Sequence, residues 1–132
     1  SSITLKFLFI IALLANLSEG FFLTSKVQIS ITNSLSNNKK LIIHCKSKNK
    51  DLNIHVIQKG ETYEFKVENS FWGRTLYFCG FKFDHKLHMF DIYVQSRDDD
   101  NCLGYCEWEI TESGPCLTYN PHRGIYTYCF YW

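Results

Sequence analysis

The sequence lacks the short motifs that mark the common enzyme classes. Its 132 residues contain no nucleophile elbow, no P-loop and no glycine-rich phosphate cradle. His85, His88 and Asp91 come nearest to a metal site, but the two-residue period of a strand would put His88 on the opposite face from the other two. Glu107 and Glu109 share one face of a strand pattern, which fits a solvated face more simply than a pair of glycosidase carboxylates. We therefore expect no catalytic residue, no metal ligand and no cofactor.

A charge excess of either sign is also lacking. Lysine and arginine number 14 against 13 aspartate and glutamate residues, so the net charge is +1. Proteins that bind nucleic acid usually carry a clear basic excess that neutralises phosphates. The overall charge favours no particular partner, and we expect no nucleic acid.

Long apolar runs are absent except near the start of the chain. Lys6 precedes an apolar run over residues 7–15, and the small residues Ser18 and Gly20 follow. A positive residue, a short apolar run and small residues describe a secretory signal peptide. The run is also shorter than the roughly 20 residues that a membrane-spanning helix needs. We predict a signal peptide over residues 1–20 and one secreted domain over residues 21–132, with no membrane insertion after cleavage.

Cysteine, by contrast, is plentiful. An even number of cysteines in a short exported domain indicates a disulfide framework, which offsets the small core of such a chain. A zinc site at Cys102 and Cys106 would need a second cysteine pair at similar spacing. Disulfides are the better interpretation, although six cysteines can pair in many ways and the sequence does not choose among them. The candidates are Cys45, Cys79, Cys102, Cys106, Cys116 and Cys129.

A two-residue period dominates the rest of the sequence. Apolar residues alternate with polar ones over residues 27–32, 62–68 and 106–111, and further runs rich in β-branched and aromatic residues follow at about ten-residue spacing. Glycine, proline, asparagine and aspartate fall between these runs, and no stretch after the leader keeps helical spacing for three turns. The pattern predicts an all-β fold, an antiparallel sandwich or barrel of about seven to nine strands.

Alternation also predicts which side chains form the core. An immunoglobulin core would include a tryptophan shortly after Cys45, and that tryptophan is missing. We therefore expect a sandwich of another type. Its predicted core residues are Val27, Ile29, Ile43, Leu52, Tyr63, Phe65, Leu76, Phe78, Ile92, Trp108 and Ile110.

Several short motifs follow one another along the chain after the leader. They are His44-Cys45-Lys46-Ser47-Lys48, Thr75-Leu76-Tyr77-Phe78-Cys79, Phe90-Asp91-Ile92-Tyr93, Cys102-x3-Cys106-x-Trp108-x-Ile110 and Gly114-Pro115-Cys116. In this order they resemble the plant S-protein homologue family, and the resemblance extends over nearly all of the chain after the leader. In that family's pattern acidic residues are usual where this chain has Asn49 and Lys50, and a glycine is usual at Asn53.

The resemblance implies a small, disulfide-bonded antiparallel β-sandwich that is secreted and has no catalytic activity. The chain is similar to the stigma determinants of poppy-type self-incompatibility, which act as ligands for a receptor in the pollen membrane. Most relatives have no assigned role. The implied function is therefore that of a secreted signalling-type ligand for a plasma-membrane receptor, which we expect to act as a monomer.

Surface loops are the expected receptor contacts, because loops can vary without disturbing the core. Tryptophan and arginine dominate binding hot spots, and we expect Phe71 to point inward and leave its neighbour Trp72 exposed. Our leading hypothesis is that Trp72 and an acidic loop contact the receptor. The candidates are Trp72 and Arg74, the basic edge Lys46, Lys48 and Lys50, and the acidic loop Arg97, Asp98, Asp99 and Asp100.

Two alternatives to a receptor ligand stay open. Exposed aromatic and carboxylate side chains could instead serve a sugar-binding or defence module of the extracellular matrix. The chain could also be a purely structural secreted protein.

Overall fold

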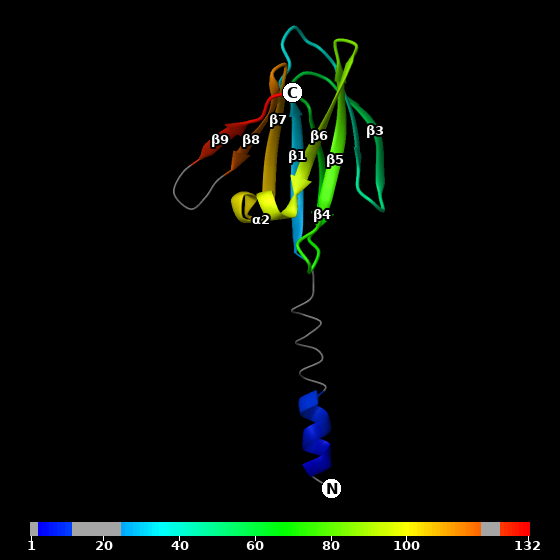
Figure 1. The fold of residues 1–132 in the computed structure, drawn as a ribbon, viewed down its shortest axis with the longest axis vertical. Helices are drawn as coiled ribbons and strands as arrows, with labels where there is room; N and C mark the ends of the chain where they lie inside the picture. Colours follow the sequence, from blue (N-terminus) through cyan, green and yellow to red (C-terminus); the bar gives the residue numbers. More distant parts are fainter. Residues whose placement is uncertain (1–2, 12–24, 120–124) are drawn as a thin grey trace.

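The computed structural model describes residues 3–11, 25–119 and 125–132 of the chain. From residue 25 on, the described residues form nine strands in two stacked sheets, with one short helix at their lower end (Figure 1). The elements are β1 (Lys26–Asn33), β2 (Leu41–Lys46), β3 (Asp51–Ile57), β4 (Thr62–Glu68), β5 (Leu76–Phe83), β6 (Lys86–Val94), α2 (Gln95–Cys102), β7 (Tyr105–Thr111), β8 (Gly114–Tyr119) and β9 (Tyr126–Cys129). The predicted all-β sandwich is confirmed.

The leader stays a prediction. Residues 3–11 are helical, and all of them are exposed. No helix among the described residues is long and apolar enough to cross a membrane. The expected cleavage point after Gly20 lies outside the described residues.

One sheet has five strands in the order β4-β1-β7-β8-β9, and the other has four in the order β3-β2-β5-β6. All neighbouring strands are antiparallel except β1 and β7, which pair in parallel with Ile31 opposite Trp108. Strands so far apart in the chain are free of the constraint that a tight hairpin turn imposes. The antiparallel prediction therefore holds with this one exception.

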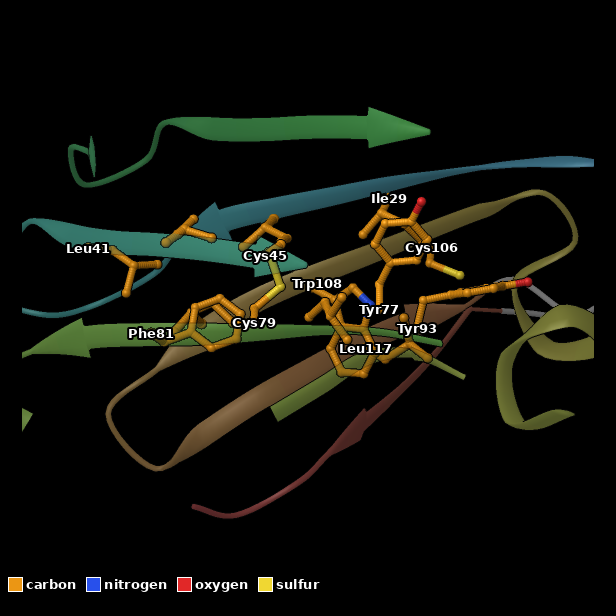
Figure 2. Packing of buried hydrophobic residues seen from close by; sticks show 14 of the residues in the cluster. Ile29, Leu41, Cys45, Tyr77, Cys79, Phe81, Tyr93, Cys106, Trp108 and Leu117 are labelled. Atoms are coloured by element: carbon orange, nitrogen blue, oxygen red, sulfur yellow. A yellow bond between two sulfur atoms is a disulfide. The ribbon is translucent and has the colours of Figure 1, made fainter. Parts of the chain in front are cut away.

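The core lies between the two sheets, where Figure 2 shows Trp108 and Ile29 among the packed side chains. The burial predicted from two-residue alternation is correct for β1, in which Val27, Ile29 and Ile31 are at most 1% exposed. It is also correct for β7, where Cys106, Trp108 and Ile110 are buried. The full set of predicted core residues that are buried is Val27, Ile29, Ile43, Ile92, Trp108 and Ile110, and Leu52, Tyr63 and Phe65 pack against them in part.

The prediction for β5 was wrong by one residue. Leu76 is 42% exposed and Phe78 is only half-buried, whereas Tyr77 and Cys79 point into the core. Both faces of this strand carry apolar side chains, so alternation does not fix which face is inside. A bulge between Tyr77 and Phe78 in the pairing with β6 adds a further shift.

All six cysteines form disulfides, as predicted, and no thiol is free. Two of the bridges join residues that lie opposite each other in neighbouring strands: β2 with β5, and β8 with β9. The third closes a short loop between the end of α2 and β7. The pairs are Cys45–Cys79, Cys116–Cys129 and Cys102–Cys106.

The bridges should stabilise the domain unequally. Cys45–Cys79 spans 34 residues of sequence and Cys102–Cys106 spans only 4. Because a longer closed loop removes more entropy from the unfolded chain, we expect replacing the first pair by alanine to cost about 4 kcal/mol and the second about 2 kcal/mol. Urea unfolding of the two double variants measures this. Equal losses would contradict the loop-entropy account.

A carboxylate joins two loops at the end of the sandwich that lies away from α2. Glu112, between β7 and β8, accepts hydrogen bonds from the hydroxyl and the backbone N–H of Ser36, at 2.6 and 2.5 Å. These bonds, aided by the charge of Lys39, lower the pKa of Glu112 from 4.5 to about 2. The two loops that meet here lie at the end of the sandwich away from α2 (Figure 1).

This hydrogen-bonded carboxylate predicts part of the acid sensitivity. A group whose pKa is lower in the folded state stabilises the fold above its unfolded pKa, and the gain is lost as pH falls through the folded value. For Glu112 this window lies between pH 4.5 and about 2. We expect urea midpoints measured at pH 7 and pH 2.5 to differ less in Glu112→Gln than in the unchanged protein. An identical drop in both would mean that this carboxylate contributes nothing.

Candidate binding groove

The turn between β2 and β3 forms one wall of a groove. Ser47 donates its backbone N–H to the carbonyl of Lys50 at 2.8 Å, and the N–H of Lys50 donates to the Ser47 hydroxyl at 3.1 Å. The turn follows directly on the Cys45–Cys79 bridge of the sheet. Its backbone is therefore held in place while the side chains of Lys48 and Lys50 are exposed.

The opposite wall is the loop over residues 69–75, between β4 and β5. Gln95 at the start of α2 holds it: the side-chain oxygen of Gln95 accepts from the N–H of Ser70 at 2.9 Å, and its amide donates to the Ser70 carbonyl at 3.0 Å. The Ser70 hydroxyl in turn accepts from the N–H of Arg74 at 2.8 Å. Gly73 adopts a φ of 72°, which a residue with a side chain rarely adopts. These contacts give the loop a defined shape.

Between the two walls lies a groove of about 580 Å³. The β2 and β5 strands are paired, so the turn that follows β2 lies beside the loop that precedes β5. Leu76 and Phe78 of β5 supply apolar surface in the groove. The complete lining is Ser47, Lys48, Asn49, Lys50, Glu68, Ser70, Trp72, Arg74, Thr75, Leu76, Tyr77 and Phe78.

The groove carries unpaired positive charge. Among the described residues, no carboxylate lies within 4.0 Å of Lys48, Lys50 or Arg74. The acid that lines the groove, Glu68, faces Lys26 at 3.8 Å. Charges left without a partner on a fixed backbone are available to an anionic group of another molecule.

Lys46, the remaining residue of the predicted basic edge, stands opposite Asp51 in the pairing of β2 with β3. The N–H of Asn53 and the imidazole of His44, which lies 2.7 Å from the carboxylate, lower the pKa of Asp51, with a smaller effect from Lys46. Lys46 is not among the residues that line the groove, and its charge acts on a neighbouring carboxylate.

Trp72 is 76% exposed, in agreement with the expected exposure. Phe71 was expected to point inward and does not, since it is 57% exposed and packs edge-on against the Trp72 ring at 5.0 Å. In a loop rather than a strand, neighbouring side chains need not alternate between faces. Two aromatic rings instead of one are therefore accessible next to Arg74.

The predicted acidic loop is a helix, and this prediction was wrong. Residues 95–102 form α2. Arg97 donates to both carboxylate oxygens of Asp98, at 2.6 and 2.8 Å, and Asp98 also accepts from the N–H of Val94 at 2.8 Å. Asp98 is 1% exposed, so it is unavailable to a partner. Its role is to hold the first turn of the helix.

The remaining acidic candidates, Asp99 and Asp100, have different surroundings. Asp99 accepts a hydrogen bond from Asn69 at 2.7 Å, and Asn69 accepts from the hydroxyl of Tyr93. Burial raises the pKa of Tyr93. Asp100 alone is exposed, and within the part of the chain that the structure describes its side chain has no hydrogen-bonded or ionic partner. An acidic contact surface on this segment is thus reduced to Asp100.

The residues considered for catalysis lie apart. Among residues 3–11, 25–119 and 125–132, no three His, Cys, Asp or Glu side chains gather as a metal site would require. His88 stacks on Trp132 with ring centroids 4.5 Å apart, and His85 lies in the turn before β6. Glu107 and Glu109 face solvent from β7 beside a shallow polar hollow.

The comparisons with known proteins agree with one another. A family profile described as plant self-incompatibility protein S1 matches residues 28–132. The chain is 41% identical over 119 residues to S-protein homolog 2 of Arabidopsis thaliana, covering 87% of this chain and 73% of that protein. It is 41% identical over 104 residues to S-protein homolog 5 of the same plant, covering 79% and 76%.

A solved structure supports the fold. It is described as "Structure of SPH (Self-Incompatibility Protein Homologue) proteins, a widespread family of small, highly stable, secreted proteins from plants". It matches with a TM-score of 0.59 at 18% identity, over 76% of this chain and 90% of that chain. At this identity the likeness concerns the β-sandwich alone.

Asp98 and Asp100 offer a matched test of the helix. Asp98→Ala would leave the Arg97 guanidinium and the Val94 N–H without their acceptor, and we expect a loss of about 3 kcal/mol in the free energy of unfolding. Asp100→Ala removes an exposed charge and should change stability by less than about 0.5 kcal/mol. Urea denaturation compares the two. Equal effects would show that the Asp98 pair does not hold the helix.

Proposed function

The chain belongs to the plant self-incompatibility protein S1 family of S-protein homologues, and from this we propose that it is a secreted, non-enzymatic ligand for a cell-surface receptor protein. The resemblance expected from its sequence motifs is confirmed by the family match and by relatives at 41% identity. The observation that carries the proposal is the groove between residues 47–50 and 69–75. It places Trp72, Arg74, Lys48 and Lys50 around one hollow.

The proposal of secretion rests on two features. The disulfides Cys45–Cys79, Cys102–Cys106 and Cys116–Cys129 suit an oxidising compartment. The leader predicted over residues 1–20 would deliver the chain there.

The groove suits protein recognition because its walls are fastened in advance. Binding costs free energy when loops and side chains must be ordered, and a loop already held by hydrogen bonds avoids part of that cost. Gln95 and the Ser70 hydroxyl hold one wall, and the Ser47–Lys50 turn holds the other. One wall leaves Trp72 and Arg74 exposed, two residue types that dominate binding hot spots, and the other wall leaves Lys48 and Lys50 exposed.

The sugar-binding alternative has less support in this groove. Sugar recognition needs polar groups that can bond to hydroxyls. Here the Ser47 and Ser70 hydroxyls accept bonds from their own loops, and the Thr75 hydroxyl donates to the Glu68 carbonyl at 2.8 Å. The exposed remainder is mainly apolar and cationic.

Substitutions in the groove test the proposal. We expect the tagged, secreted protein to capture one transmembrane protein from a plant plasma-membrane extract, as identified by mass spectrometry. Trp72→Ala should weaken this capture about thirtyfold, equivalent to ~2 kcal/mol, because an exposed hot-spot ring is lost. Arg74→Glu should do the same by reversing a charge in the groove.

Two variants away from the groove are controls. Lys59→Glu reverses an exposed charge in the turn between β3 and β4, at the other end of β3. Tyr131→Ala removes a ring that is 81% exposed near the C-terminus. Both should capture as well as the unchanged protein. Full capture by folded Trp72→Ala and Arg74→Glu would move the contact away from this groove.

A further inference from the structure

The solvent faces of the two sheets differ in chemistry. On the five-stranded sheet the outward residues are mostly polar or charged, among them Ser30, Thr32, Glu64, Glu107 and Glu109. On the four-stranded sheet they are largely apolar: Ile42, Ile54, Val56, Phe78, Leu87 and Met89. Of these, Ile54, Val56, Leu87 and Met89 are each more than half exposed. A contiguous exposed apolar surface of this kind marks an interaction site more often than a solvated sheet face does.

The strand register makes this apolar face continuous. Ile42 lies opposite Val56 on one side and Lys82 on the other, and Lys82 lies opposite Leu87. The next row crosses the sheet from Ile54 through His44 and Gly80 to Met89.

Because Gly80 has no side chain, the side chains of Leu87 and Met89 can pack close to the backbone of the sheet. A Cβ at this position would stand 3.1 Å from Leu87 Cδ1 and 3.3 Å from Met89 Sδ, closer than most real Cβ contacts. With glycine here, Leu87 and Met89 can cover the middle of the sheet and form a flat apolar surface.

The apolar face runs into the basic groove. Phe78 lies opposite Lys46 and Asp91 in the sheet and also lines the groove, and Leu76 lines the groove two residues earlier. One surface therefore begins with Lys48, Lys50 and Arg74 around the groove and continues as apolar rows along the strands.

The charges on this surface select the kind of partner. Five cations lie on it, while Asp51 is paired with His44, Glu68 of the groove faces Lys26, and Asp91 is the remaining carboxylate. A second copy of this chain packed face to face would bring like charges together, which opposes a dimer. Carboxylates of a partner protein would complement these cations, which gather mainly at one end of the strands. The five cations are Lys46, Lys48, Lys50, Arg74 and Lys82.

We propose that the receptor contact extends from the groove over the outer face of β3, β2, β5 and β6, and that its occupant is a protein segment with clustered carboxylates followed by apolar side chains. The carboxylates would meet Lys48, Lys50 and Arg74, and the apolar side chains would cover Met89 and Leu87. This inference rests on the proposed receptor-ligand function and adds the chemistry of the partner.

A defined peptide tests the chemistry without the receptor. The probe is a synthetic peptide of sequence Glu-Glu-Glu-Glu-Ser-Leu-Ser-Leu-Ser-Leu, titrated into the secreted, oxidised protein and followed by amide chemical shifts. We expect shifts in the 47–50 turn, the 69–75 loop and strands β5 and β6. Peptides with lysine for glutamate or serine for leucine should bind at least tenfold more weakly. Shifts confined to the five-stranded sheet, or equal binding of all three peptides, would overturn the proposal.

Substitution of the apolar face adds a second measurement. Met89→Glu should weaken binding of the glutamate–leucine peptide at least tenfold, and Met89→Gln should weaken it less. Ile125→Glu is the control, because Ile125 is 74% exposed beside the five-stranded sheet. Unchanged binding by folded Met89→Glu would remove the apolar face from the contact. Concentration-dependent dimerisation in sedimentation, or binding to phosphatidylserine vesicles that Met89→Glu abolishes, would assign the face to another occupant and overturn the proposal.

Receptor capture separates the two proposals. If a transmembrane protein is captured and lost with Trp72→Ala but kept with Met89→Glu, the receptor function stands and the extended contact fails. If the peptide binds as expected but no receptor is captured, the surface chemistry stands and the receptor function fails.

Discussion

The contact on which the groove end of this domain depends is the ion pair between Arg97 and the buried carboxylate of Asp98. The pair fixes the first turn of α2, and the Arg97 guanidinium lies 5.1–5.6 Å from the ring centres of Phe90, Trp108 and Phe130. A buried carboxylate is costly unless it is paired and hydrogen-bonded, and Asp98 is both. The helix thereby joins β6, β7 and the segment after β9.

Residues of this helix also hold one wall of the groove in place. Gln95, two residues before Arg97, holds Ser70 through two hydrogen bonds, and Asp99 holds Asn69. The loop that presents Trp72 is therefore fastened to a helix that is itself fastened to the core. The acidic segment, which resembled a contact loop in the sequence, instead supports the loop beside it.

The sequence predicts most strands of this fold, but it predicts less well which face of each strand is buried. Val27, Ile29 and Ile31 alternate with polar residues, so their strand has only one face that can be buried. In β5 apolar residues occupy both faces, and what places Cys79 inside is its pairing with Cys45, which no pattern reveals. The helix α2 was missed for a related reason: its eight residues, QSRDDDNC, carry no apolar stripe. It is held by one buried salt bridge and a disulfide rather than by an amphipathic face.

The groove was predictable in its parts but not as a whole, because it depends on which strands pair. Lys48 and Trp72 are separated in the chain by β3 and β4, which belong to different sheets, and they line the same groove because β2 lies beside β5. In the family pattern that the motifs follow, acidic residues are usual at the positions of Asn49 and Lys50. This chain has a neutral and a basic residue there, in a turn whose backbone bonds do not involve those side chains. A turn held by backbone and serine contacts can change its charge without changing its shape, so the charge of this groove can vary while the sandwich keeps its form.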